Sequence, residues 1–138
     1  MSKELKCIML IDDNPDDNFF HEREIKKNNI AKSVVTQGSG TDALEYIVLD
    51  KKPSPDIIFL DINMPGMNGW EFLKEYDKLE AGLKNSIIII MLTTSDNPDD
   101  AFRAEGIGAV SDYITKPLTA EILKTVLTKY FGSSSVNV

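Results

Sequence analysis

The segment Asp-Ile-Ile-Phe-Leu-Asp at residues 56–61 constrains the fold more strongly than any other part of the chain. Its four consecutive apolar residues are typical of a strand that is buried on both faces, as in a parallel sheet. The run ends on Asp61, and the proline and glycines of residues 65–69 predict a loop directly after it. Because open parallel sheets bind ligands outside the carboxyl ends of their strands, Asp61 is a candidate functional residue.

Other apolar runs alternate with segments of helical periodicity along the whole chain. Strands are predicted at residues 7–11, 33–37, 56–61, 87–92 and 109–114, and helices at 15–27, 41–48, 70–79, 98–105 and 119–130. Residues 81–85 are expected to form a loop. This alternation predicts an α/β fold in which helices cover both faces of a parallel sheet.

The predicted helix starts carry capping patterns. Asn14 is expected to cap the first helix, with proline at its first position and Asp16 and Asp17 in its first turn, where acids complement the helix dipole. That role is preferred to metal binding for both acids. Thr41 is the expected cap of the second helix. His21, the only histidine, is interpreted as a surface or packing residue of the first helix.

Composition limits the class of protein. A chain of 138 residues with 42% hydrophobic and 27% charged residues predicts one globular domain, assigned to residues 7–131 with a lead-in at 1–6 and a flexible tail at 132–138. A polar start, short apolar runs and a single cysteine, Cys7, favour a reduced cytoplasmic protein without a membrane segment. The net charge of −7 argues against direct nucleic-acid binding.

Polar residues follow the predicted strands at one edge of the sheet. They are Asp12, Asp13, Asp61, Thr93 and Lys116. Three carboxylates in one pocket repel each other, which is expected to raise at least one of their pKa values and to require a cation. Carboxylate oxygens with a loop carbonyl suit Mg²⁺, while a lysine and a hydroxyl supply donors for a phosphoryl group.

With these motifs, the chain from Cys7 to Tyr130 resembles a response-regulator receiver domain of two-component signalling, of the chemotaxis-receiver-like, single-domain type. The resemblance implies a five-stranded parallel sheet of order 2-1-3-4-5 in a flavodoxin-like (βα)5 three-layer sandwich. It further implies that Asp61 is the phosphoacceptor. Asp13 and Asp61 would bind Mg²⁺ (or Mn²⁺) directly, Asp12 would bind it through water, and the backbone carbonyl of Asn63 would be a further ligand.

The same resemblance assigns roles to the later residues. Lys116 would pair with phosphoryl oxygens and be aimed by a cis peptide bond to Pro117. Thr93 and Tyr113 would form the switch. Asn63 and Ser95 would tune the lifetime of the phosphorylated state. Thr94 occupies a position at which the family usually has alanine or glycine, and Asn68 a position at which many members have aspartate.

The implied function is phosphoryl transfer to Asp61 from a sensor histidine kinase or a histidine phosphotransfer protein, followed by hydrolysis of the aspartyl phosphate. The chain would catalyse only these steps on itself and would not otherwise be an enzyme. Phosphorylation would reshape a surface for a downstream protein. The protein is expected to be a monomer or weak dimer that binds neither nucleic acid nor membrane.

Competing functions make different demands on the same residues. A flavin- or nucleotide-binding module would need a glycine- or serine/threonine-rich loop where residues 12–17 are mostly acidic. A non-enzymatic interaction module would be expected to lack a pocket residue, and none is missing. A calcium loop would need glycine and glutamate where Asp17 and Arg23 stand. An aspartyl phosphatase would need an aspartate in place of Asn63.

Overall fold

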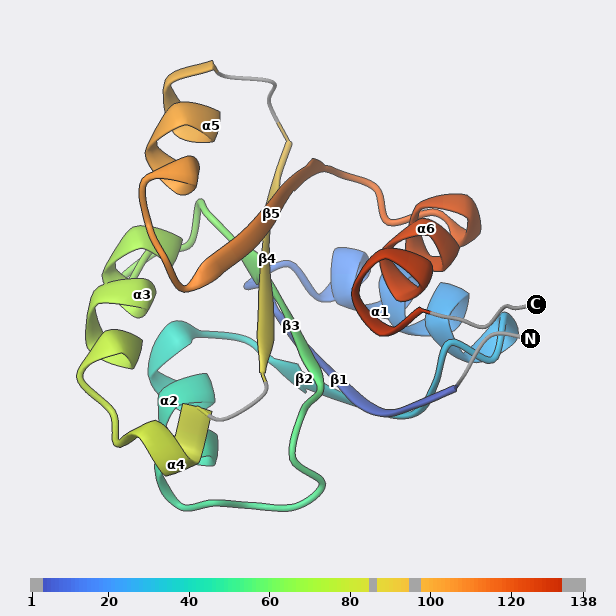
Figure 1. Cartoon of the computed structure of the whole chain (residues 1–138), viewed down its shortest axis with the longest axis horizontal. Coiled ribbons are helices and arrows are strands. Elements are labelled where there is room, and N and C mark those ends of the chain that lie inside the picture. Colours follow the sequence, from blue (N-terminus) through green and yellow to red (C-terminus); the bar gives the residue numbers. More distant parts are fainter. Residues whose placement is uncertain (1–3, 85–86, 95–97, 133–138) are drawn as a thin grey trace.

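A computed structural model describes residues 4–84, 87–94 and 98–132, and these form one parallel sheet covered by helices on both faces (Figure 1). The strands are β1 (Leu5–Ile11), β2 (Ala31–Gln37), β3 (Ile57–Asp61), β4 (Ile88–Thr93) and β5 (Val110–Thr115). The helices are α1 (Pro15–Lys27), α2 (Gly40–Val48), α3 (Gly69–Asp77), α4 (Ala81–Lys84), α5 (Pro98–Glu105) and α6 (Ala120–Phe131).

The strand order is β2-β1-β3-β4-β5, and all four neighbouring pairs are parallel. The predicted flavodoxin-like topology is therefore confirmed. Helices α1 and α6 cover one face of the sheet, and α2, α3 and α5 cover the other (Figure 1). Because every crossover returns the chain to the same end of the sheet, the carboxyl ends of all the strands lie along one edge.

Two hydrophobic clusters, one on each face, hold the three layers together. Successive residues of a strand point to opposite faces, so Ile8 and Leu10 of β1 enter the cluster beneath α1 and α6, while Met9 and Ile11 enter the other. Every residue of β3 is buried. This burial explains why β3 carries an unbroken apolar run rather than an alternating pattern.

Several element boundaries differ from the sequence prediction. Strands β1 and β2 each begin two residues earlier than predicted, because Leu5 pairs with Ala31 and its amide donates to the carbonyl of Ile30 at 2.9 Å. Strands β4 and β5 extend one residue further, to Thr93 and Thr115, which pair with each other. The assigned lead-in of residues 1–6 therefore includes the start of β1.

Two local predictions were wrong. The cap of α2 is Ser39 and not Thr41, since the Ser39 hydroxyl accepts from the amide of Asp42 at 3.1 Å. The region predicted as a loop contains the short helix α4. By contrast, Asn14 caps α1 as predicted, accepting from the amides of Asp16 and Asp17.

The chain ends of the domain agree with the sequence prediction only in part. Helix α6 ends at Phe131 and Gly132 follows as its cap, at the predicted stop. The tail beyond it, and Asn97 before α5, lie outside the described residues.

Among the residues that the structure describes, no helix has the length and apolar character needed to cross a membrane.

Candidate functional site

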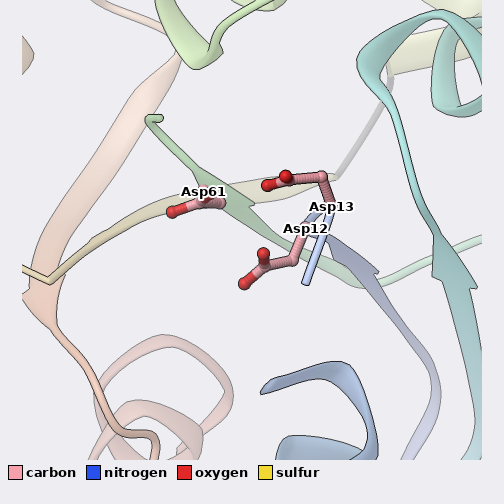
Figure 2. Close-up of side chains that lie close together, drawn as sticks. All are labelled: Asp12, Asp13 and Asp61. Atoms are coloured by element: carbon pink, nitrogen blue, oxygen red, sulfur yellow. The ribbon is translucent and has the colours of Figure 1, made fainter. Parts of the chain in front are cut away.

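Three carboxylates meet at the carboxyl ends of β1 and β3. Asp12 and Asp13 follow β1 directly, and Asp61 is the last residue of β3 (Figure 2). Each residue offers an oxygen, and these atoms all lie within 4.8 Å of one another. Asp12 and Asp61 are buried, whereas Asp13 is exposed to solvent. An all-oxygen set that is open on one side fits a hard divalent cation that keeps part of its water shell, such as Mg²⁺.

Backbone hydrogen bonds fix the position of Asp12. Its amide donates to the carbonyl of Gln37 on β2 at 3.1 Å, which extends the β1–β2 pairing by one step. Its side chain accepts from the amide of Asn14 at 3.0 Å, and its carbonyl accepts from the side-chain amide of Asn18 at 2.9 Å. The start of α1 therefore holds the first carboxylate of the site in place.

The loop after β3 is held close to Asp61 by the start of α3. Asn68 and Glu71 form a reciprocal capping box at this helix. Gly69 follows the cap, and its amide donates to the carbonyl of Ile62 at 2.8 Å. A Cβ at Gly69 would lie 2.9 Å from the carbonyl oxygen of Asp61, so only glycine fits without movement. Asn63 lies in the loop between Asp61 and Gly69 and is exposed.

Lys116 brings the positive charge to this site from the opposite end of the sequence. Its Nζ atom lies 2.7 Å from Asp12, 2.9 Å from Asp17 and 3.4 Å from Asp61. Its side chain is only 9% exposed. The backbone amide of Lys116 donates to the carbonyl of Thr93 at 2.7 Å, and the peptide bond to Pro117 is cis.

The environment changes the acidity of both central groups. Burial, reinforced by repulsion from Asp12, raises the pKa of Asp61 to about 6, although Lys116 opposes this shift. Repulsion was the cause expected from the sequence, but burial is the larger one. Burial also disfavours the charge on Lys116, yet the hydrogen bonds to Asp12 and Asp17 outweigh it and raise the pKa of the lysine.

The two expected switch residues lie near this edge of the sheet on β4 and β5. Thr93 is the last residue of β4 and is fully buried. Tyr113 pairs with Met91 across the two strands. Its hydroxyl is buried and has no hydrogen-bond partner among the described residues. Ser95, expected to tune the lifetime of the phosphorylated state, lies outside the described residues, whereas Thr94 is described and exposed.

Helix α1 contributes to this site in a way that was not predicted from the sequence. Asp17 is an ion-pair partner of Lys116, in addition to standing in the first turn of the helix. His21 is buried, which agrees with the packing role and not with the surface position among the two alternatives, and burial together with the charge of Lys116 lowers its pKa. Asn18, His21 and Ile25 are the buried residues of α1. Their spacing of three and four residues could have placed the two polar side chains on the same face as Ile25.

The arrangement of the fold and the acidic site agrees with a known family. The model of the response regulator receiver domain matches residues 8–128, and the chain belongs to this family. It is a receiver of two-component signalling, a family in which phosphorylation of an aspartate is the general function.

Similar proteins span nearly the whole receiver. Protein PilH of Pseudomonas aeruginosa is 30% identical over 120 residues, which cover 86% of this chain and 93% of PilH. A two-component response regulator from Cytophaga hutchinsonii has a TM-score of 0.85 and 31% identity, covering 94% of this chain and 98% of its own. The phosphorylated cyanobacterial phytochrome response regulator RcpA has a TM-score of 0.76 and 28% identity, covering 95% and 97%.

Proposed function

We propose that Asp61 is the phosphoacceptor of this receiver and that it takes its phosphoryl group from a phosphohistidine. The observation that carries the proposal is the position of Asp61, at the end of β3 beside two further carboxylates and with its oxygen 3.4 Å from the ammonium of Lys116. Of the three acids in the cluster, only Asp61 is itself part of a strand. The phosphorylated state of the similar receiver RcpA supports this chemistry.

In the proposed reaction, a carboxylate oxygen of Asp61 attacks phosphorus and the P–N bond of the phosphohistidine breaks. The electron pair of that bond stays on the imidazole, which takes up a proton as it leaves. Lys116 holds a fixed positive charge beside the transferred oxygens, where it stabilises charge without further rearrangement. Hydrolysis later releases phosphate and restores the carboxylate.

A divalent cation fits the same pocket. Asp13 and Asp61 would hold Mg²⁺ (or Mn²⁺) directly, Asp12 through water, and Asn63 through its backbone carbonyl. When bound, the cation neutralises the negative charge that accumulates around the phosphoryl group. The donor set supports this assignment because carboxylate and carbonyl oxygens are the ligands that such ions prefer.

We further propose that the switch passes through Thr93 and Tyr113 to the face formed by β5, α5 and α6. The new phosphoryl oxygens offer acceptors for the hydroxyl of Thr93, which ends the neighbouring strand β4. Moving that hydroxyl changes the space available to Tyr113. The Tyr113 hydroxyl has no hydrogen-bond partner among the described residues, so the ring can move without breaking a hydrogen bond to any of them.

The proposed partners are a sensor histidine kinase or a histidine phosphotransfer protein, and one downstream protein that binds the reshaped face. The proposed oligomeric state is a monomer or weak dimer. The proposed location is the cytoplasm. This location is supported because the chain has a single cysteine, Cys7, and so does not rely on an internal disulfide; the thiol is free and buried.

The test is phosphate incorporation from acetyl phosphate and from a phosphorylated histidine kinase, with Mg²⁺ present. The parent chain should acquire phosphate that is labile in alkali and to hydroxylamine, as an acyl phosphate is, and Asp61→Asn should acquire none. Asp50→Asn is the matched control, because Asp50 is an exposed acid just after α2. Its backbone has a positive φ, a conformation that asparagine also adopts. Full labelling of Asp61→Asn would show that another residue accepts the phosphate.

A further inference from the structure

The ammonium of Lys116 is shared by three carboxylates that have different roles. Asp12 and Asp61 belong to the acidic cluster that fits a cation, but Asp17 does not. Its side chain comes from the first turn of α1 and approaches Lys116 from outside that cluster. A cation held by this cluster would interact with two of the lysine's partners, Asp12 and Asp61, and Asp17 would remain a partner of Lys116 alone.

Asp17 contacts Lys116, whereas its neighbour Asp16 does not. Asp16 and Asp17 both follow the Asn14 cap, and either acid complements the positive end of the helix dipole. Among the described residues, only Asp17 of this pair bonds to a lysine, at 2.9 Å. The side chain of Lys116 is 9% exposed, whereas that of Asp17 is 35% exposed, so the pair lies at the rim of the pocket.

The three distances to Lys116 are unequal. An ammonium has three N–H donors, and Asp12 at 2.7 Å and Asp17 at 2.9 Å accept hydrogen bonds. Asp61 lies further away, at 3.4 Å, in an ion pair. In the unphosphorylated protein the lysine is therefore bound more closely to Asp17 of α1 and to Asp12, directly after β1, than to Asp61.

We propose that Asp17 is a positioning residue that holds Lys116 on the α1 side of the pocket, so that a phosphoryl group on Asp61 must compete with Asp17 for the ammonium. This inference rests on the function proposed above for Asp61. It predicts that Asp17 weakens the interaction of Lys116 with phosphoryl oxygens. Phosphorylation would then loosen the contact between Lys116 and the first turn of α1.

The variant Asp17→Asn keeps the shape of the side chain and removes its charge. A neutral amide oxygen accepts more weakly from an ammonium than a carboxylate does. We therefore expect beryllofluoride, which mimics the phosphoryl group, to bind Asp17→Asn about three- to tenfold more tightly than the parent. Asp17→Glu, which restores the charge, should return affinity toward that of the parent.

The matched control is Asp16→Asn, which removes the same charge from the same helical turn without touching Lys116. The experiment titrates beryllofluoride into each variant of the 138-residue chain in saturating Mg²⁺, and titrates Mg²⁺ alone in parallel. Asp17→Asn should raise the affinity for beryllofluoride more than Asp16→Asn does. The two variants should change the affinity for Mg²⁺ by the same amount. A change confined to folding or to overall charge would not separate the two titrations.

The inference is overturned if Asp17→Asn and Asp16→Asn give equal beryllofluoride affinities, or if Asp17→Asn binds more weakly than the parent. The latter result would mean that Asp17 directs Lys116 toward the phosphoryl group. Failure of the proposed function looks different. In that case the parent would not bind beryllofluoride, or Asp61→Asn would bind it as tightly as the parent does.

Discussion

The Nζ atom of Lys116 lies 2.7 Å from a carboxylate oxygen of Asp12, although 104 positions separate the two residues in the sequence. The contact joins the loop after β5 to the loop after β1 across the sheet edge where Asp61 ends β3. It places an ammonium group whose side chain is 9% exposed beside the buried acids Asp12 and Asp61, and the charge of each group then depends on the others. A substitution at this edge of the sheet therefore changes both the charge balance and the packing of the pocket.

Replacing Asp61 with asparagine should stabilise the protein at neutral pH. The folded-state pKa of Asp61 is raised from 3.8 to about 6, so the folded protein binds this proton more tightly than the unfolded chain. The stability from this group is present below about pH 4 and is lost as pH rises through about 6. The free energy of unfolding of Asp61→Asn should therefore exceed that of the parent by on the order of 1 to 3 kcal/mol at pH 7.5.

Urea unfolding at a series of pH values between acidic and mildly alkaline, in chelator, measures this difference. The stabilities of Asp61→Asn and the parent should converge as the pH falls below about 4, because Asp61 is then protonated in both the folded and the unfolded state. A difference that does not change with pH would show that burial does not raise the pKa of Asp61.

Replacing Asp13 with asparagine should weaken cation binding without harming the fold. Asp13 is the exposed member of the acidic cluster, and the change removes one negative charge at nearly constant shape. In chelator the variant should melt no lower than the parent, since repulsion is reduced. In millimolar Mg²⁺ the parent should gain thermal stability by mass action and the variant much less, with its Kd for Mg²⁺ about tenfold higher or more.

Thermal melting of both chains with chelator and with Mg²⁺ provides the check. If Asp13→Asn keeps the full gain in Tm on adding Mg²⁺, the cation does not bind to the cluster of Asp12, Asp13 and Asp61. Asp42→Asn, in the first turn of α2, is a suitable control for general loss of negative charge.

Replacing Gly69 with alanine should destabilise the protein by about 1 to 3 kcal/mol. The added Cβ would lie 2.9 Å from both the carbonyl oxygen of Asp61 and the Cα of Ile62, which are backbone atoms that cannot turn away. The backbone must move to make room for this Cβ, and that movement should displace Asp61 and slow its phosphorylation. Chemical denaturation gives the stability, and labelling with acetyl phosphate gives the rate.

Gly82→Ala is the matched control for this substitution. Gly82 lies in the short helix α4, and a Cβ there would meet nothing within 4 Å. Its stability should be unchanged or slightly raised, because alanine favours helix more than glycine does. Equal effects of the two substitutions would show that the close approach at Gly69 does not limit the fold.

Replacing Tyr113 with phenylalanine should leave the resting protein equally stable, or more stable by up to about 1 kcal/mol. The hydroxyl of Tyr113 is buried with no hydrogen-bond partner among the described residues, so the change removes a polar group that gains nothing from its position. Tyr130→Phe is the contrasting control, since the Tyr130 hydroxyl donates to the carbonyl of Ser111 at 2.9 Å. It should lose about 1 kcal/mol.

Urea denaturation of the two variants beside the parent makes this comparison. A loss in Tyr113→Phe as large as that in Tyr130→Phe would mean that the Tyr113 hydroxyl has a partner in solution. Hydrogen exchange around Tyr113 with and without beryllofluoride tests the proposed switch separately. Identical exchange in both conditions would limit the switch to changes within the pocket.

The strand order 2-1-3-4-5 was implied by the resemblance to receiver domains, whereas the sequence by itself determined the order of the elements and the α/β class of the fold. Residues a few positions apart decide these features, through buried apolar runs, helical spacing and caps such as Asn14 and Asn68. It also placed the candidate site, because the ends of parallel strands must share one edge of a sheet. The predictions for Thr41 and for the loop at 81–85 failed because several local patterns compete at short helix starts.

Only the tertiary structure decided which charges touch. The sequence placed Lys116 beside the acids at the ends of β1 and β3, but only the packing of α1 against the sheet brought Asp17 to it. The same packing made burial, rather than repulsion, the main cause of the raised pKa of Asp61. Such contacts depend on how helices and loops pack against the sheet, and no pattern within a few residues contains that information.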